Sequence, residues 1–207
     1  AGNGSSELMS NISSSLISML YNLQLMKYFG ENGIAAYGVL MYVQFIFVAI
    51  YLGYTIGVSP VISYHYGAEN RKEVQNLFAK IIISGIVLTL TARFASPYIS
   101  AIFVGYDTEL LALTIRAFTL FSLMFAPAGF NIMTSSFFTA LNNGKISAFI
   151  SFMRTLLFQA GSILFLPVLI GKNGIWLSSF TAEVLTLLIS IGSLIVLHNE
   201  YHYFPHR

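Results

Sequence analysis

Two charged residues that could do chemistry stand inside apolar stretches of the chain. Glu183 falls in the stretch 175–197, and Arg154 falls in the stretch 145–169. An ionised side chain within a membrane segment costs about 3 kcal/mol unless it is paired or neutralised. A carboxyl group without a partner there would favour its protonated form, so it could take up and release a proton as a proton-coupled transporter requires. The alternative is that Glu183 only stabilises the fold.

Arg154 is the natural candidate for a partner of Glu183, but the distances along the chain argue against a direct ion pair. Counted from a turn at Gly171–Gly174, Arg154 lies about 18 residues before it and Glu183 about 10 residues after it, a difference near 12 Å at helical rise. We therefore expect the two side chains to lie too far apart to pair.

Other polar residues recur at helical spacing inside the apolar stretches. In the first stretch they follow one another at three- and four-residue intervals, which places them on one helical face. Serine and threonine on such faces often serve only helix packing, and Glu7, near a helix start, would also suit the headgroup region. The candidates for a substrate or ion pathway are Glu7, Asn11, Asn22, Gln44, Arg154, Gln159 and Glu183.

Several other chemistries are not supported by the sequence. The chain has no cysteine, which excludes thiol catalysis, disulfides and cysteine-bound zinc. His65 stands alone, and the other histidines, His198, His202 and His206, follow in a tail that we expect to fray, so we predict no metal site. No hydrolase triad or phosphate-binding loop occurs, and the net charge of +2 is scattered. We predict neither an enzyme nor a nucleic-acid-binding protein.

The composition is that of a membrane protein. Hydrophobic residues make up 56% of the chain and charged residues 9%, against about a quarter charged in globular proteins, and the mean hydropathy is +0.75. We expect an all-α bundle of six membrane helices in one domain over residues 1–207, joined by short turns. The predicted spans are 7–26, 34–66, 74–103, 109–141, 145–169 and 175–197. Proline removes a helical hydrogen bond, so the second span should bend near Gly57–Pro60.

Basic residues in the predicted turns indicate the orientation in the membrane. If the N-terminus is cytoplasmic, the turns place Arg71, Lys72, Lys80, Lys145 and Arg207 on that side, against Lys27 and Lys172 opposite. We therefore expect cytoplasmic termini. The chain starts without methionine or a signal peptide, and we expect it to be a piece of a longer protein.

Four motifs resemble the multidrug and toxic compound extrusion (MATE) transporters, in the MepA-like branch. The first is GYTIGVSPVISYHYGAENRKEV at 53–74, and FAPAGFN at 125–131, FFTALNNGKISAFISFMRT at 137–155 and GIWLSSFTAEVLT at 174–186 follow in the family's order. In the first motif, the residues at the matching spacing are Pro60, Ser63, Gly67 and Ala68, and together with Gly57 they form the expected structural motif.

The resemblance implies one six-helix lobe, the C-terminal one, of a twelve-helix transporter in the inner (plasma) membrane of the cell. Such a protein would export organic cations by alternating access, in exchange for protons or sodium ions, with no other cofactor. Its partners would be the lipid bilayer and the missing six-helix lobe. Residues 117–144 contain no acid, unlike the matching helix of some sodium-coupled members. Two alternatives are a flippase for lipid-linked oligosaccharides and a membrane scaffold that transports nothing.

Overall fold

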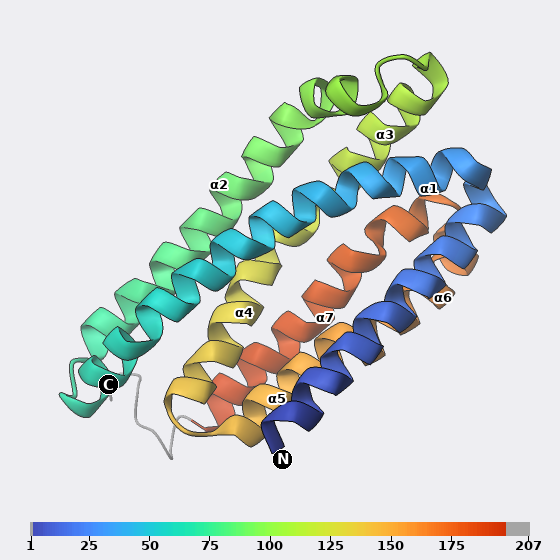
Figure 1. Cartoon of the computed structure of the whole chain (residues 1–207). Coiled ribbons are helices and arrows are strands. Elements are labelled where there is room, and N and C mark those ends of the chain that lie inside the picture. The colour runs from blue at the N-terminus through green and yellow to red at the C-terminus, as the bar shows by residue number, and fades with distance from the viewer. Residues whose placement is uncertain (1, 198–207) are drawn as a thin grey trace.

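The computed structural model describes the backbone of residues 2–197, and side chains from residue 13 onward except those of residues 71, 78 and 81. The described chain is helical and forms an elongated bundle (Figure 1). Its elements are α1 (Gly2–Gly67), α2 (Arg71–Val104), α3 (Thr108–Phe121), η1 (Ser122–Met124), α4 (Phe125–Ala140), α5 (Gly144–Phe152), η2 (Met153–Phe158), α6 (Gln159–Ile170) and α7 (Asn173–Val196). Glu7, Asn11, Arg71, Arg207 and the tail histidines therefore lie outside the described side chains.

Helix α1 contains two membrane passes, because the chain reverses at Gly30. The backbone angles of Gly30 are φ 64° and ψ −153°, a conformation that glycine adopts without steric cost. The described residues hold five apolar helical stretches long enough to cross a membrane, and the first, Ser13–Gly67, has 55 residues. A straight helix of that length would be about 80 Å long, far more than one crossing needs. Divided at Gly30, α1 supplies two apolar helical stretches, so that the described chain passes along the bundle six times.

The turns at one end of the bundle share a common chemistry. Glu69 and Asn142, with φ of 56° and 60°, end α1 and α4 in the left-handed conformation that commonly closes helices. The residue after each of them starts the next helix, since the side chains of Asn70 and Asn143 accept hydrogen bonds from the backbone amides of Glu73 and Ile146. Figure 1 shows these two turns at the N-terminal end and the turns at Gly30 and Gly171 at the other.

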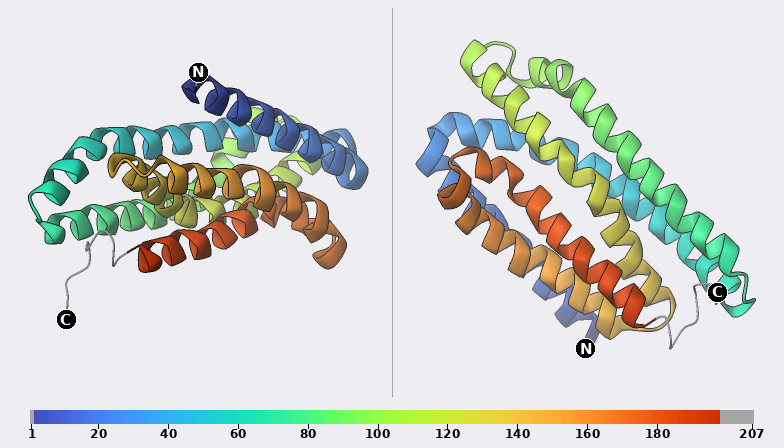
Figure 2. Two further views of the ribbon diagram at one scale, coloured as in Figure 1. Left: turned by 90° about the horizontal axis from the view of Figure 1, so that it is seen from below. Right: turned by 180° about the vertical axis from the view of Figure 1, so that it is seen from behind.

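The predicted proline motif lies at the end of α1. Helix α1 remains helical through Pro60, and its last turns bend away from the preceding axis (Figure 2, left). The hydroxyl of Ser63 donates to the carbonyl oxygens of Ser59, at 3.1 Å, and of Ala140, at 3.3 Å. It thereby joins the end of α1 to the end of α4.

Two of the long helical segments, which we call rods, change helix type in the middle: residues 108–140 and 144–170. A 3₁₀ turn, η1, joins α3 to α4, and a π-helical segment, η2, joins α5 to α6. Predicted spans 109–141 and 145–169 cover both of these helical segments, but no residue pattern in them predicts the changes of helix type. The second one matters because it contains Arg154.

Helix α4 lies in the interior, and α2 lies on the outside (Figure 2, right). Buried residues of α4 include Phe125, Asn131, Met133 and Phe137. By contrast, many large apolar side chains of α2 are exposed, such as Ile83 at 61% and Phe94 at 74%. In a membrane these side chains would contact lipid, which does not oppose their exposure as water would.

Candidate functional site

Arg154 lies inside the π-helical segment η2, Met153–Phe158, and Gln159 directly follows it, which brings the two side chains to the same side of the helix. Hydrogen bonds in a π-helix join residue i to residue i+5, which brings residues five apart onto nearly one face. In an α-helix the same two positions would differ by about 140° around the axis. Both side chains accordingly bond to α7, Arg154 to Glu183 and Gln159 to Ser179.

Glu183 is buried in the middle of α7 and is held from two other elements. Nε of Arg154 donates to Oε1 of Glu183 at 2.8 Å. Nδ2 of Asn131 in α4 donates to Oε2, and also to the backbone carbonyl oxygen of Glu183, both at 2.8 Å. The hydroxyl of Ser190 donates to Oδ1 of Asn131 at 2.9 Å. Each carboxylate oxygen thus has a partner, and only 5% of the Glu183 side chain is exposed.

The expectation that Arg154 and Glu183 lie too far apart to pair is therefore wrong. Helices α6 and α7 are in contact a few residues away from the turn that joins them. A Cβ on Gly174 would lie 2.6 Å from the carbonyl carbon and oxygen of Leu166. Counted from this contact, Arg154 is about 12 residues away along its rod and Glu183 about nine, which leaves a difference near 4.5 Å. A long arginine side chain spans that difference. Four polar residues of α7 that recur at helical spacing are buried and face inward: Ser179, Glu183, Thr186 and Ser190.

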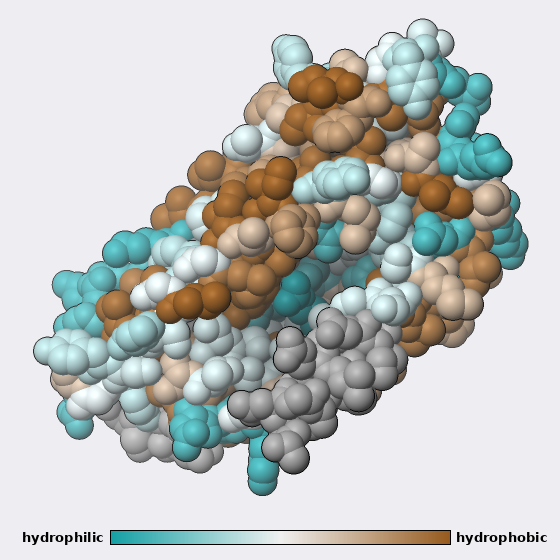
Figure 3. Space-filling model, viewed as in Figure 1, coloured by the Kyte–Doolittle hydropathy of each residue, from teal (hydrophilic) through white to brown (hydrophobic). Residues whose placement is uncertain are grey.

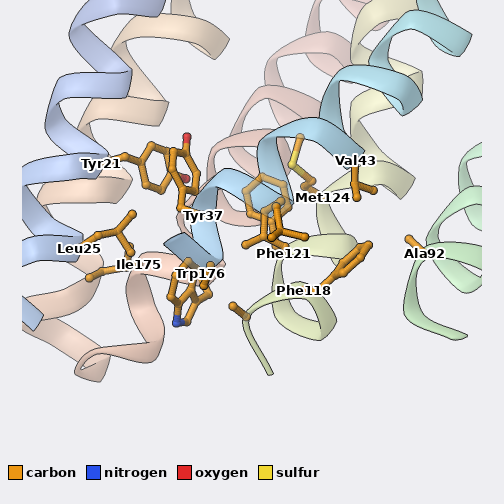
Figure 4. Close-up of a cluster of buried hydrophobic side chains, with 14 of the residues drawn as sticks. Tyr21, Leu25, Tyr37, Val43, Ala92, Phe118, Phe121, Met124, Ile175 and Trp176 are labelled. Atoms are coloured by element: carbon orange, nitrogen blue, oxygen red, sulfur yellow. The ribbon is translucent and has the colours of Figure 1, made fainter. Parts of the chain in front are cut away.

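Tyr21, in the first half of α1, is the centre of a second polar group. Its hydroxyl shares hydrogen bonds of 2.6 Å with the hydroxyls of Ser178 and Ser179. Nε2 of Gln159 donates to the same Tyr21 oxygen at 2.9 Å. The Tyr21 ring stacks on Tyr37, with ring centroids 4.5 Å apart (Figure 4). This group fixes both halves of α1 against α6 and α7.

These two polar groups border a cavity of about 180 Å³, which we name the inner cavity. Its charged residues are Arg154 and Glu183. Its other polar lining residues are Ser14, Ser18, Tyr21, Tyr37, Gln44, Thr155, Gln159 and Ser179. Figure 3 shows hydrophilic atoms deep in the hollow between the two halves of α1. A polar cavity inside a membrane bundle can hold water, an ion or a polar part of a ligand.

The structure brings four of the seven predicted pathway residues to the inner cavity: Gln44, Arg154, Gln159 and Glu183. Asn22 lies elsewhere, in an open hollow of about 780 Å³ along the first half of α1. It is exposed there, beside Ser15 and Met19. Glu7 and Asn11 lie outside the described side chains. The open hollow belongs to the outer surface of this chain.

Asn131 and Tyr21 are the site residues that the sequence analysis missed. Asn131 was noted only as the last residue of the FAPAGFN motif, yet an amide within an apolar span needs a buried partner, and that requirement could have singled it out. Tyr21 gave no comparable signal, because a tyrosine in a membrane helix is usually placed at the interface. Among the described residues, no group of three or more histidine, cysteine or acidic side chains could hold a metal ion.

Comparison with solved structures gives strong matches over most of the chain. An outward-facing multidrug resistance MATE family transporter matches with a TM-score of 0.83 and 16% identity, over 97% of this chain and 46% of that chain. An inward-facing one matches with a TM-score of 0.83 and 17% identity, over 95% and 47%. The MATE transporter VcmN of Vibrio cholerae, in a bent form, matches with a TM-score of 0.81 and 16% identity, over 97% and 47%.

At these identities the solved structures show the fold, and the chain spans about half the length of each of them. Comparison with curated protein sequences gives no match. The sequence profile of the MatE family, however, matches residues 8–162, about three quarters of the chain. The apolar helices, the six-pass bundle and this profile agree, and the chain belongs to the MatE family of multi-pass membrane proteins.

Proposed function

We propose that the chain is the C-terminal half of a transporter that exports organic cations and drugs by antiport with protons or sodium ions. The observation that carries this proposal is the inner cavity, a polar space with a buried ion pair inside a bundle of membrane length. Maintaining charged groups within a bilayer is costly, and they mark transport pathways more often than they stabilise folds. Neither feature suits a scaffold that transports nothing.

The missing half would pack along the open hollow on the first half of α1. That surface is both polar and apolar, since it carries Ser15 and Asn22 beside the exposed side chains of Met19, Leu23 and Met26. Asn22 in contact with lipid would be unfavourable, whereas a second lobe or a water-filled cleft would accept it. The twofold length of the matching transporters supports such a second lobe.

Alternating access would then move this lobe as a rigid unit. The chain matches the outward-facing and the inward-facing transporter with the same TM-score of 0.83. Such agreement is expected if the lobes keep their shape while they rock against each other. We place both termini on the cytoplasmic side of the inner, or plasma, membrane, because the basic turns favour that side.

Glu183 is our candidate for the coupling acid. Proton uptake by its carboxylate would remove the negative charge that pairs with Arg154 and would free the guanidinium for another partner. Asn131 would hold the protonated side chain in place, since its amide bonds to the backbone of Glu183 as well. A sodium ion could be held by Glu183 only after Arg154 has left the carboxylate, and it would need further oxygen ligands, which Ser179 and Gln44 offer at the cavity wall. A flippase would instead need a cavity with several basic residues for pyrophosphate, and the inner cavity has one arginine, whose charge Glu183 offsets.

Efflux by the full-length transporter in cells tests this proposal. Glu183→Gln should abolish pH-dependent ethidium efflux while the protein is still expressed and inserted. The matched control is Glu109→Gln, because Glu109 is exposed at the start of α3 and away from the cavity. Normal pH-dependent efflux by Glu183→Gln would remove Glu183 from the coupling mechanism.

A further inference from the structure

We infer that the inner cavity binds an oxygen acceptor of the transported compound, a carboxylate or carbonyl group on an aromatic ring, rather than its cationic nitrogen. The inference rests on the proposed transport function and specifies which end of a substrate enters this lobe. It assigns Arg154 and Gln44 as the residues that select that end.

The carboxylate of Glu183 has little capacity left for a cation. Its Oε1 accepts from Arg154 and its Oε2 accepts from Asn131, and 5% of the side chain is exposed. A cationic nitrogen would have to displace one of these donors and leave it without a partner in a buried place. Losing a bond of that kind costs as much as the new one provides.

Arg154, by contrast, lines the cavity and has unused donors. Only its Nε has a hydrogen-bond partner among the described residues, and the two terminal nitrogens have none. The Arg154 side chain is 21% exposed, and it has no buried nitrogen that lacks a partner. Its two terminal nitrogens are therefore accessible. Arg154, the positively charged partner, is thus the more exposed member of the ion pair. Two adjacent N–H groups in one plane fit a carboxylate or a carbonyl oxygen.

Two neutral groups at the cavity wall extend this donor set. Gln44 and Tyr37 line the cavity, and neither side chain has a hydrogen-bond partner among the described residues. They come from the second half of α1, across from the rod that carries Arg154. An acceptor group placed between them would therefore receive hydrogen bonds from two sides.

The size and the walls of the inner cavity limit what it can hold. Its volume of about 180 Å³ is below the roughly 300 Å³ at which pockets begin to enclose drug-sized ligands. It would take one end of a compound, with the rest extending outward. The stacked rings of Tyr21 and Tyr37 form one side, against which an aromatic ring bearing the acceptor can pack.

Binding of two matched ring compounds to the full-length transporter in lipid nanodiscs tests the inference. Benzoate carries the acceptor and benzylammonium carries the cation on the same ring, and titration by nuclear magnetic resonance gives the Kd of each. We expect benzoate to bind at least about tenfold more tightly. Arg154→Lys, which keeps the charge but loses the planar donors, should weaken benzoate about tenfold or more, and Gln44→Leu several-fold. Arg116→Lys, an exposed arginine of α3, is the control and should change nothing.

Tighter binding of benzylammonium would overturn the inference, as would unchanged benzoate binding in both Arg154→Lys and Gln44→Leu. If Arg154→Lys does not fold, Gln44→Leu decides alone, because Gln44 has no partner to lose. Ethidium efflux from cells that express the same variants of the full-length transporter separates the two proposals. Efflux without benzoate binding refutes the acceptor site only, and benzoate binding without any efflux refutes the transport function only.

Discussion

Breaking the ion pair between Arg154 and Glu183 should destabilise the protein unequally, depending on which partner is removed. Removing one member of a buried pair costs about 3–5 kcal/mol, because the other charge is left without compensation. Arg154→Met leaves the carboxylate, which is 5% exposed, whereas Glu183→Gln leaves the guanidinium, which is 21% exposed. We therefore expect about 4 kcal/mol for Arg154→Met and about 3 kcal/mol or less for Glu183→Gln.

The double variant, Arg154→Met with Glu183→Gln, should recover most of that loss. Replacing a buried pair with neutral side chains of similar volume is often close to neutral, so we expect a net change within about 1 kcal/mol. The two changes would then interact by several kcal/mol in a double-mutant cycle. Asn131 can still bond to the amide of the new glutamine, which keeps α4 attached to α7.

Thermal unfolding of the purified full-length transporter, followed by size-exclusion chromatography, measures these differences. For a unit of about 200 residues, 1 kcal/mol corresponds to about 2–4 °C, so Arg154→Met should lower the Tm by roughly 8–16 °C. Equal Tm values for wild type and both single variants would show that the ion pair is absent in the membrane protein. A double variant as unstable as Arg154→Met would refute the reasoning about uncompensated charge.

Three further outcomes are expected. Single cysteines at Lys72, Lys145 and Lys172 report the orientation. A membrane-impermeant reagent added outside cells should label only the cysteine at Lys172, and labelling at Lys72 and Lys145 instead would reverse the orientation. Gly174→Ala should lower the Tm, because the added Cβ would lie 2.6 Å from the Leu166 backbone. Gly192→Ala is the control and should not lower the Tm, because Gly192 has open space around it. Equal Tm values for the two variants would refute the close contact. Tyr21→Phe should cost about 1–3 kcal/mol, because Ser179 and Gln159 lose a shared buried partner; an unchanged Tm would show that water replaces the hydroxyl.

The spans and turns could be predicted because they depend on local sequence. A bilayer excludes charge over about 20 residues, so uncharged stretches mark the helices. Glycine and asparagine mark the turns, because they adopt the positive φ that Gly30, Asn142 and Gly171 have in the structure. The inward position of Glu183 in α7 agrees with the same physics, since its charge is costly in contact with lipid.

The ion pair could not be predicted, because it depends on two features without a local signal. The π-helical segment Met153–Phe158 contains neither proline nor glycine, so nothing in its sequence marks the change of helix type. The early contact between Gly174 and Leu166 depends on how closely two helices pack. Assuming straight α-helices that separate at the turn therefore overestimated the distance from Arg154 to Glu183.

Transport in proteoliposomes tests the central claim, that the inner cavity with its ion pair forms part of a transport pathway. The full-length transporter is reconstituted, a pH or sodium gradient is imposed, and ethidium movement is followed for wild type and for the double variant Arg154→Met with Glu183→Gln. Because that variant should remain folded, its transport reports on function rather than stability. We predict gradient-driven transport by wild type and its loss in the folded double variant. Transport at the wild-type rate by the double variant would contradict the account.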